Sequence, residues 1–212
     1  MSSVAKGLGA RRIAGDRLVC GWMHGHDQTG RQSGITHIEA ERDGWRYTAP
    51  LTGNLRVVTF HTDSDLDAAS VAAGPTLLQR TSDLDLIARV LSGSGFTPDR
   101  TVGFCAAHSA VLTPSTDDGW LAVGDAALGF DPLSSQGLFN ALYTGLAGAE
   151  AADRALDDDA EALPGYQQQI ASIKTAYRTH LTAWYGLERR WPDSPFWRRR
   201  HQFEDGPLPP PP

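Results

Sequence analysis

Apolar and polar side chains alternate along the first third of this chain with the period of a β-strand. The alternation is clearest in Leu55–His61, where Val58 and Phe60 face away from Val57, Thr59 and His61. A period of two indicates a strand with one buried face. Four such runs predict four strands: Arg17–His26, Gly34–Glu41, Trp45–Leu51 and Leu55–His61. Thr52-Gly53-Asn54 is a hairpin turn between the last two, and the short connections predict an antiparallel sheet.

The pattern becomes helical after Asp63. Spaced Leu, Ile and Val residues predict two short helices up to about Ser92, split near Thr81-Ser82, with Ser82 as the N-cap of the second. The run Thr101–Leu112 predicts a further strand. The remaining expected helices are residues 2–10, a long helix from Gly137, and one from about Ala160 or Pro164 to Arg190.

The segment Gly119–Gly137 reads G-W-L-A-V-G-D-A-A-L-G-F-D-P-L-S-S-Q-G. Leu121–Val123 predicts a short buried strand that ends at Gly124-Asp125. Asp131-Pro132 then leads into the start of a helix near Ser135. A helix start carries unpaired N–H donors and a partial positive charge, so it suits an anion or an electron-rich ring edge.

This segment resembles the second flavin-binding motif of FAD-dependent monooxygenases and flavin-dependent halogenases, G-D-A followed by D-P-x-x-S-x-G. In that family the Asp of Gly-Asp contacts the ribityl chain of FAD, and the second turn lies against the isoalloxazine ring. The resemblance implies that FAD is the cofactor. It assigns FAD contacts to Gly124, Asp125, Ala126, Pro132, Leu133, Ser134, Ser135, Gln136 and Gly137. From the residues alone, Asp131 fixes the turn before Pro132, and the two serines are also N-cap residues.

The family's first motif, G-x-G-x-x-G in a βαβ unit, does not occur in this sequence. The chain therefore resembles the C-terminal part of such a flavoprotein, lacking the N-terminal Rossmann βαβ unit. The expected fold class is α+β: an antiparallel substrate-domain sheet, the second half of an FAD-binding domain, and long C-terminal helices. The expected divisions are 1–113 for the sheet and substrate part, 114–158 for the second FAD motif and its helix, 159–205 for the C-terminal helical region, and 206–212 for a disordered Pro-rich tail.

Four residues are candidates for a substrate pocket: Trp45, Tyr47, His61 and His108. Trp45–Pro50 resembles the halogenase signature W-x-W-x-I-P, but Tyr47 replaces the second Trp and Ala49 the Ile, which leaves halogenation in question. Each aromatic residue is equally explained by core packing, and each histidine is either a general base or a core histidine. His24 and His26 share a strand face without a third ligand nearby, so no metal site is expected. No catalytic residue is assigned.

Net charge and composition restrict which partners and cellular locations are expected for the protein. A net charge of −6 argues against nucleic acid as the main partner, and 41% hydrophobic residues suffice for a core. Cys20 and Cys105 match no metal or C-x-x-C spacing and are read as small buried residues. The sequence has no secretory signal and no apolar run that suits a membrane, so the expected location is the cytoplasm.

The C-terminal run Arg190–His201 is rich in arginine and aromatic residues. By physical chemistry alone it is an amphipathic terminal helix or a nucleic-acid patch, and the overall acidity favours the helix. The run also resembles the ending of a flavoprotein subgroup that matures quinone-cofactor enzymes by hydroxylating a side chain of a partner protein.

Three functions remain open. The first, implied by the resemblance, is an FAD-dependent monooxygenase that acts through a flavin hydroperoxide on an aromatic or protein-bound side chain. Its electrons would come from NAD(P)H or a flavin reductase. The second is a non-catalytic remnant or an interaction subunit that completes its FAD site with another chain. The third is a flavin-dependent halogenase.

Overall fold

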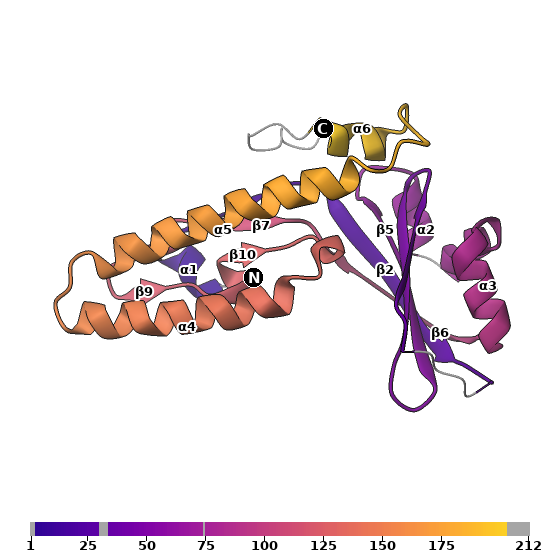
Figure 1. The fold of residues 1–212 in the computed structure, drawn as a ribbon, viewed down its shortest axis with the longest axis horizontal. Coiled ribbons are helices and arrows are strands. Elements are labelled where there is room, and N and C mark those ends of the chain that lie inside the picture. The colour runs from indigo at the N-terminus through magenta and orange to yellow at the C-terminus, as the bar shows by residue number, and fades with distance from the viewer. Residues whose placement is uncertain (1–2, 30–33, 74, 203–212) are drawn as a thin grey trace. The chain divides into compact units, whose positions relative to one another are not determined.

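The computed structural model describes residues 3–29, 34–73 and 75–202 (Figure 1). The expected disordered tail, 206–212, lies outside these residues. Contacts group the described residues into two compact units. Unit 1 comprises residues 3–16 and 108–187. Unit 2 comprises residues 17–107, apart from the gaps just given, and 188–202.

Unit 2 is built on a five-stranded antiparallel sheet with the order β3-β4-β5-β2-β6. Its strands are β2 (Leu18–His26), β3 (His37–Glu41), β4 (Gly44–Pro50), β5 (Leu55–Asp63) and β6 (Thr97–Ala106). The first four match the predicted strands to within a few residues. The turn between β4 and β5 places Gly53 and Asn54 at φ 69° and 61°, the left-handed geometry that favours Gly and Asn. The predicted antiparallel sheet and mixed α and β fold are confirmed.

One face of this sheet is covered by helices. Met23, Val58 and Phe60 form its buried apolar surface. Packed against them are α2 (Ala68–Ala72), the 3₁₀ helix η1 (Pro75–Asp83) and α3 (Asp85–Ser94). Gly21 is required here, because a Cβ at this position would lie 1.8 Å from the backbone oxygen of Ala72.

The start of α3 corrects the expected N-cap. The residue at the cap is Leu84, and the Ser82 hydroxyl instead bonds the Gln79 carbonyl. The cap is supplied by Glu39 on β3, whose carboxylate accepts hydrogen bonds from the first backbone N–H groups of the helix, Asp85 to Ile87, at 2.8 to 3.2 Å. A carboxylate suits the positive end of a helix, so a distant residue took the role that the local sequence suggested for Ser82.

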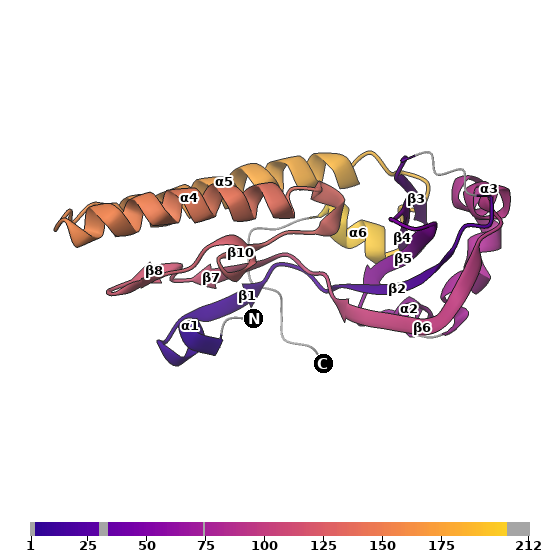
Figure 2. The ribbon, with the colours of Figure 1, turned by 90° about the horizontal axis from the view of Figure 1, so that it is seen from below.

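The C-terminal helix α6 (Pro195–His201) is also part of unit 2. Arg200 is buried on it and pairs with buried Asp63 of β5 at 2.8 Å, while its guanidinium lies 3.4 Å above the Phe196 ring. Trp197 donates its indole N–H to the Glu41 carbonyl. The part of the terminal run from Pro195 to His201 is therefore an amphipathic helix that packs on the sheet, on the side opposite α3 (Figure 2).

Unit 1 contains a helical hairpin and short strands. Helices α4 (Gly137–Leu156) and α5 (Ala162–Tyr185) lie side by side (Figures 1 and 2). They pack with a three-stranded antiparallel sheet, β1 (Arg11–Ala14), β7 (Ala110–Thr113) and β10 (Leu128–Gly129). The remaining elements are α1 (Ser3–Gly7), the hairpin β8 (Thr116–Asp117) and β9 (Trp120–Leu121), and the 3₁₀ turns η2 (Gly124–Ala126) and η3 (Pro132–Ser134).

Two predicted strands are corrected in this region. The run 101–112 is not one strand: β6 ends at Ala106 in unit 2, and β7 begins at Ala110 in unit 1. The strand expected at Leu121–Val123 is instead β9, which ends at Leu121. The chain leaves the strand there and turns into η2 at Gly124. Among the described residues, no helix has the length and apolar character needed to cross a bilayer.

Candidate functional site

Hydrogen bonds of the buried residue Asp131 fix the turn that precedes α4. This residue is 1% exposed. Its Oδ1 accepts from the Leu133 N–H at 2.9 Å, and its Oδ2 accepts from the Tyr185 hydroxyl at 2.8 Å. Its own N–H donates to the Tyr177 hydroxyl oxygen at 2.8 Å. Two tyrosines of α5 thus fix the turn, which agrees with the role that the residues alone indicated for Asp131.

The residues that follow Asp131 in the turn lie at the surface of unit 1. Ser135 has φ 53° and ψ 19°, a left-handed conformation that Gly and Asn adopt readily and that is costly for Ser. Ser135 and Gln136 are exposed, and Gly137 is half-buried. Gln136 is the N-cap of α4 but makes no side-chain cap hydrogen bond. The start of a 20-residue helix therefore faces outward without a cap from Gln136.

The Gly124–Ala126 turn packs beside the same helix. The Gly124 N–H donates to the Thr144 hydroxyl at 2.7 Å, and a Cβ on Gly124 would lie 3.3 Å from Ala141. Gly124 has φ 54°, so glycine satisfies both the conformation and the close packing. Asp125 is exposed, and its carbonyl accepts from Arg12 at 2.7 Å. All nine residues assigned to FAD by the resemblance lie in unit 1, in η2, in η3 and at the start of α4.

In unit 2, the sheet face opposite α2, η1 and α3 carries aromatic and polar side chains in rows. Strand register places Trp45, His61 and Cys20 directly opposite one another on β4, β5 and β2. The next row contains Tyr47, Thr59 and Trp22. Three of the four predicted pocket residues, Trp45, Tyr47 and His61, therefore share one face. The fourth, His108, follows β6 in unit 1 and is not in a strand, contrary to expectation.

His61 is held as a neutral ring. It is 4% exposed and stacks on Trp45, and its Nδ1 lies 3.3 Å from the Thr59 hydroxyl. Burial lowers the pKa of His61 from 6.5 to about 3, with the nearby Arg200 charge acting in the same direction and a hydrogen bond with the Trp45 backbone opposing them. A ring that resists protonation this strongly is a poor general base at neutral pH. This favours the core-histidine interpretation.

Trp22 is a member of this face that the sequence reading did not identify. It is half-buried, and its ring lies 5.0 Å from that of His24. Gly103 of β6 lies opposite it and leaves room for the indole, since a Cβ there would lie 2.1 Å from Trp22 Cε2. The alternation in Leu18–His26 places Cys20, Trp22 and His24 on one side, so the signal was present in the sequence.

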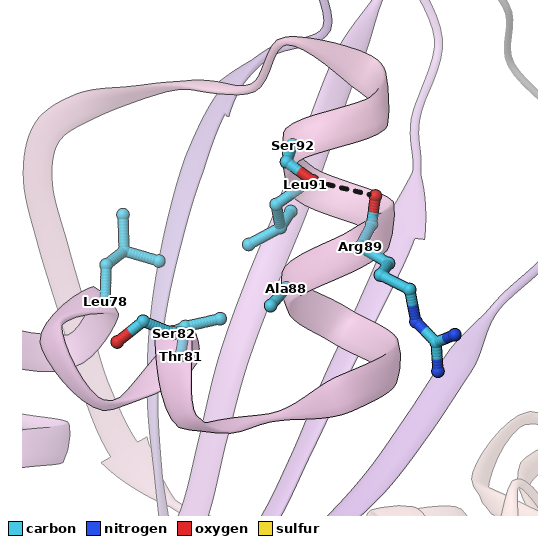
Figure 3. Close-up of a pocket in the computed structure, with 7 residues that line it drawn as sticks. All are labelled: Leu78, Thr81, Ser82, Ala88, Arg89, Leu91 and Ser92. Carbon is cyan, nitrogen blue, oxygen red and sulfur yellow. Dashed lines mark hydrogen bonds between the residues drawn. The ribbon is translucent and has the colours of Figure 1, made fainter.

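A shallow hollow of about 430 Å³ lies elsewhere in unit 2, between η1 and α3. Figure 3 shows its lining: Leu78, Thr81, Ser82, Ala88, Arg89, Leu91 and Ser92. Its one charged group, the guanidinium of Arg89, points away from the hollow (Figure 3). The hollow is on the helix-covered side of the sheet, apart from the aromatic face. Among the residues that the structure describes, no three His, Cys, Asp or Glu side chains gather as metal ligands.

Comparison with known sequences gives one clear relative. No family model matches the chain. It is 34% identical over 210 residues to "Putative FAD-dependent oxidoreductase LodB" of Marinomonas mediterranea, covering 95% of this chain and 54% of LodB. The chain thus spans about half the length of this curated relative.

Solved structures show the same fold. The flavin-dependent halogenase CmlS superposes with a TM-score of 0.78 at 24% identity, over 93% of this chain and 38% of CmlS. The peptidyl tryptophan dihydroxylase QhpG, essential for tryptophylquinone cofactor biogenesis, superposes with a TM-score of 0.74 at 22% identity, over 89% of this chain and 44% of QhpG. The resemblance to FAD-dependent oxidoreductases and flavin-dependent halogenases is confirmed, and the relatives point to FAD as the cofactor.

Proposed function

We propose that this chain supplies the flavin-ring side of an FAD-dependent oxidoreductase, of the monooxygenase type. The observation that carries the proposal is the turn from Asp131 to Gly137. Asp131 is buried and fixed by Tyr177 and Tyr185, and the exposed helix start above it receives no side-chain cap from Gln136. Such a helix start stabilises negative charge, which is what a reduced flavin ring presents.

The residues around this turn fit the cofactor. The backbone N–H groups at the start of α4, from Gly137 onward, would bind the pyrimidine edge of the ring, because the Ser135 N–H already donates to the Pro132 carbonyl. The exposed carboxylate of Asp125 would accept hydrogen bonds from the ribityl hydroxyls. When bound, the flavin supplies oxygen transfer, and the protein positions the ring and excludes water.

The substrate proposed for this site is an electron-rich aromatic group, either a small molecule or a side chain of a partner protein. Unit 2 by itself carries a sheet face with aromatic side chains, Trp22, Tyr47 and the Trp45–His61 stack, and this composition supports the choice of an aromatic substrate. Two observations favour a protein-bound side chain as the substrate. The fold is shared with a peptidyl tryptophan dihydroxylase, and the run Arg190–His201 resembles the ending of flavoproteins that hydroxylate a partner protein. NAD(P)H or a flavin reductase is the proposed electron source. The shared halogenase fold keeps halogenation as an alternative.

A surface on α4 supports the idea that further polypeptide completes the FAD site. Its outer residues are apolar and exposed to between 45% and 77%: Leu138, Phe139, Leu142, Tyr143 and Leu146. An apolar patch of this kind marks a surface that packs against protein. The sequence carries no G-x-G-x-x-G, and the match to LodB covers only 54% of that relative. We propose that a nucleotide-binding unit, from the same gene product or from another chain, packs against this α4 surface.

FAD binding tests the proposal. The 212-residue chain would be co-expressed with the part of LodB that the alignment does not cover, and the visible spectrum of the purified material recorded. We expect flavin to be retained by the pair, and retention to fall several-fold when Asp125 is changed to Ala. Asp118→Ala, an exposed Asp of the same unit, is the matched control and should retain flavin as wild type does. A pair that forms but carries no flavin, or an Asp125→Ala pair with full retention, would contradict the assignment.

A further inference from the structure

Cys20 and Cys105 lie directly opposite each other on neighbouring antiparallel strands. The register of β2 and β6 pairs them, although 84 residues separate them in the sequence. Opposed residues in such a pair have Cα atoms about 4.5–5.5 Å apart and side chains on the same face. This spacing lies inside the range that a disulfide requires, roughly 4.4–6.8 Å. The two side chains are close enough for Cys105 to act on the pKa of Cys20.

The two thiols differ in exposure. Cys20 is buried, as the sequence predicted, but the prediction was wrong for Cys105, which is exposed on the edge strand. Burial, followed by the neighbouring Cys105, raises the pKa of Cys20 to about 12. An oxidant in solution therefore reaches Cys105 first, and Cys20 is placed to react only with its neighbour.

The pair also adjoins the aromatic face of the sheet. Cys20 lies opposite His61 on β5, and the Nδ1 of His61 lies 3.3 Å from the Thr59 hydroxyl. The row Trp45, His61, Cys20, Cys105 thus runs across β4, β5, β2 and β6. A disulfide between the two cysteines would link the edge strand β6 covalently to its neighbour β2.

We propose that Cys20 and Cys105 form a dithiol site that reacts with hydroperoxides. The Cys105 thiolate attacks one oxygen of hydrogen peroxide, the O–O bond breaks, and a sulfenic acid forms as hydroxide leaves and takes up the thiol proton to become water. The Cys20 sulfur then attacks the Cys105 sulfur, an S–S bond forms, and the sulfenic hydroxyl leaves with the Cys20 proton as a second water. Two thiols are oxidised and one peroxide is reduced. No flavin takes part, so this inference is independent of the proposed function.

Thiol counting on the wild-type chain tests the site. The reduced 212-residue protein is treated with hydrogen peroxide, unfolded in guanidinium, and labelled with a maleimide. We expect two labels before treatment and none after it, with the intact mass lower by two hydrogen atoms and the labels restored by a reductant. The treated chain should run as a monomer on a non-reducing gel. Its thermal midpoint should rise, because the cross-link restricts the unfolded chain.

Two variants separate the steps. In Cys20→Ser, Cys105 should stop at the sulfenic acid, which dimedone traps. In Cys105→Ser, buried Cys20 should remain an unreacted thiol. The inference is overturned if treated wild type keeps both thiols, if Cys105 proceeds to a sulfinic acid while Cys20 stays free, or if Cys105 links two chains instead. The wild-type measurement decides the question even if a serine variant does not fold.

Discussion

The Trp45 indole lies parallel to the His61 imidazole, with ring centroids 3.7 Å apart and 7° between the planes. Both rings are buried, on adjacent strands of the unit 2 sheet. The contact is part of the burial of His61, and burial is the main reason that its pKa falls to about 3. One aromatic pair therefore links the packing of the sheet to its response to acid.

This link predicts a pH dependence of stability. Folded His61 remains neutral down to about pH 3, whereas in the unfolded chain the ring takes up a proton near pH 6.5. Below pH 6.5 the unfolded state binds more protons, so stability falls as the pH drops from 6.5 toward 3, by at most about 1.4 kcal/mol per pH unit for this group. His61→Gln should flatten this slope in urea unfolding between pH 7 and 5. His180→Gln, at an exposed position, should leave it unchanged.

A second prediction concerns the close approach of Trp22 and Gly103. A methyl group at Gly103 would overlap the indole, so Gly103→Ala should displace Trp22 and destabilise unit 2 by about 1–3 kcal/mol. Trp fluorescence and urea unfolding report the two effects. Gly93→Ala is the matched control, because no atom lies within 4 Å of a Cβ there and alanine favours the α3 helix. Equal losses in the two variants would count against the proposed contact.

The cap on α3 predicts that Glu39 contributes more to the free energy of unfolding than Ser82 does. Glu39→Ala removes a carboxylate that accepts from three helical N–H groups, and should cost about 1–2 kcal/mol of unfolding free energy. Ser82→Ala removes only a local bond to Gln79 and should change stability by less than about 0.5 kcal/mol. Chemical unfolding of both variants measures the difference. A larger loss for Ser82→Ala would restore Ser82 as the residue that matters for the helix.

The sheet of unit 2 could be predicted from the sequence because one of its faces is covered by helices. A covered face requires an apolar residue at every second position, and β5 shows that period with Val58 and Phe60. The break between β6 and β7 left no such sign, since Ala107–Ser109 are small or polar residues that suit a strand or a loop equally. The cap on α3 was also hidden, because Glu39 is 46 residues from Asp85 in the chain.

The candidate site divides in the same way. The turn motif could be read from the sequence because its chemistry is contiguous, from Gly124 to Gly137. What holds the turn could not be predicted, because Tyr177 and Tyr185 lie 46 and 54 residues beyond Asp131. His108 was grouped with Trp45 and His61 on the assumption of one long strand, and that strand is interrupted.

The anchor of the flavin turn gives the last prediction. The Tyr185 hydroxyl donates to Asp131 Oδ2 in a buried setting, and Asp131 Oδ1 holds the Leu133 N–H. Tyr185→Phe removes one hydrogen bond to a charged group and keeps the ring, so it should cost about 1.5–3 kcal/mol of stability. In the co-expressed pair described above, it should also weaken flavin retention, because the turn loses one of the contacts that fix it. Tyr143→Phe, a half-exposed tyrosine of α4, is the control for the single chain only and should change its stability little. Unfolding of the single chain and flavin content of the pair are the two measurements. A stability loss without a loss of flavin would mean that Tyr185 supports the fold of unit 1 but does not position the flavin turn.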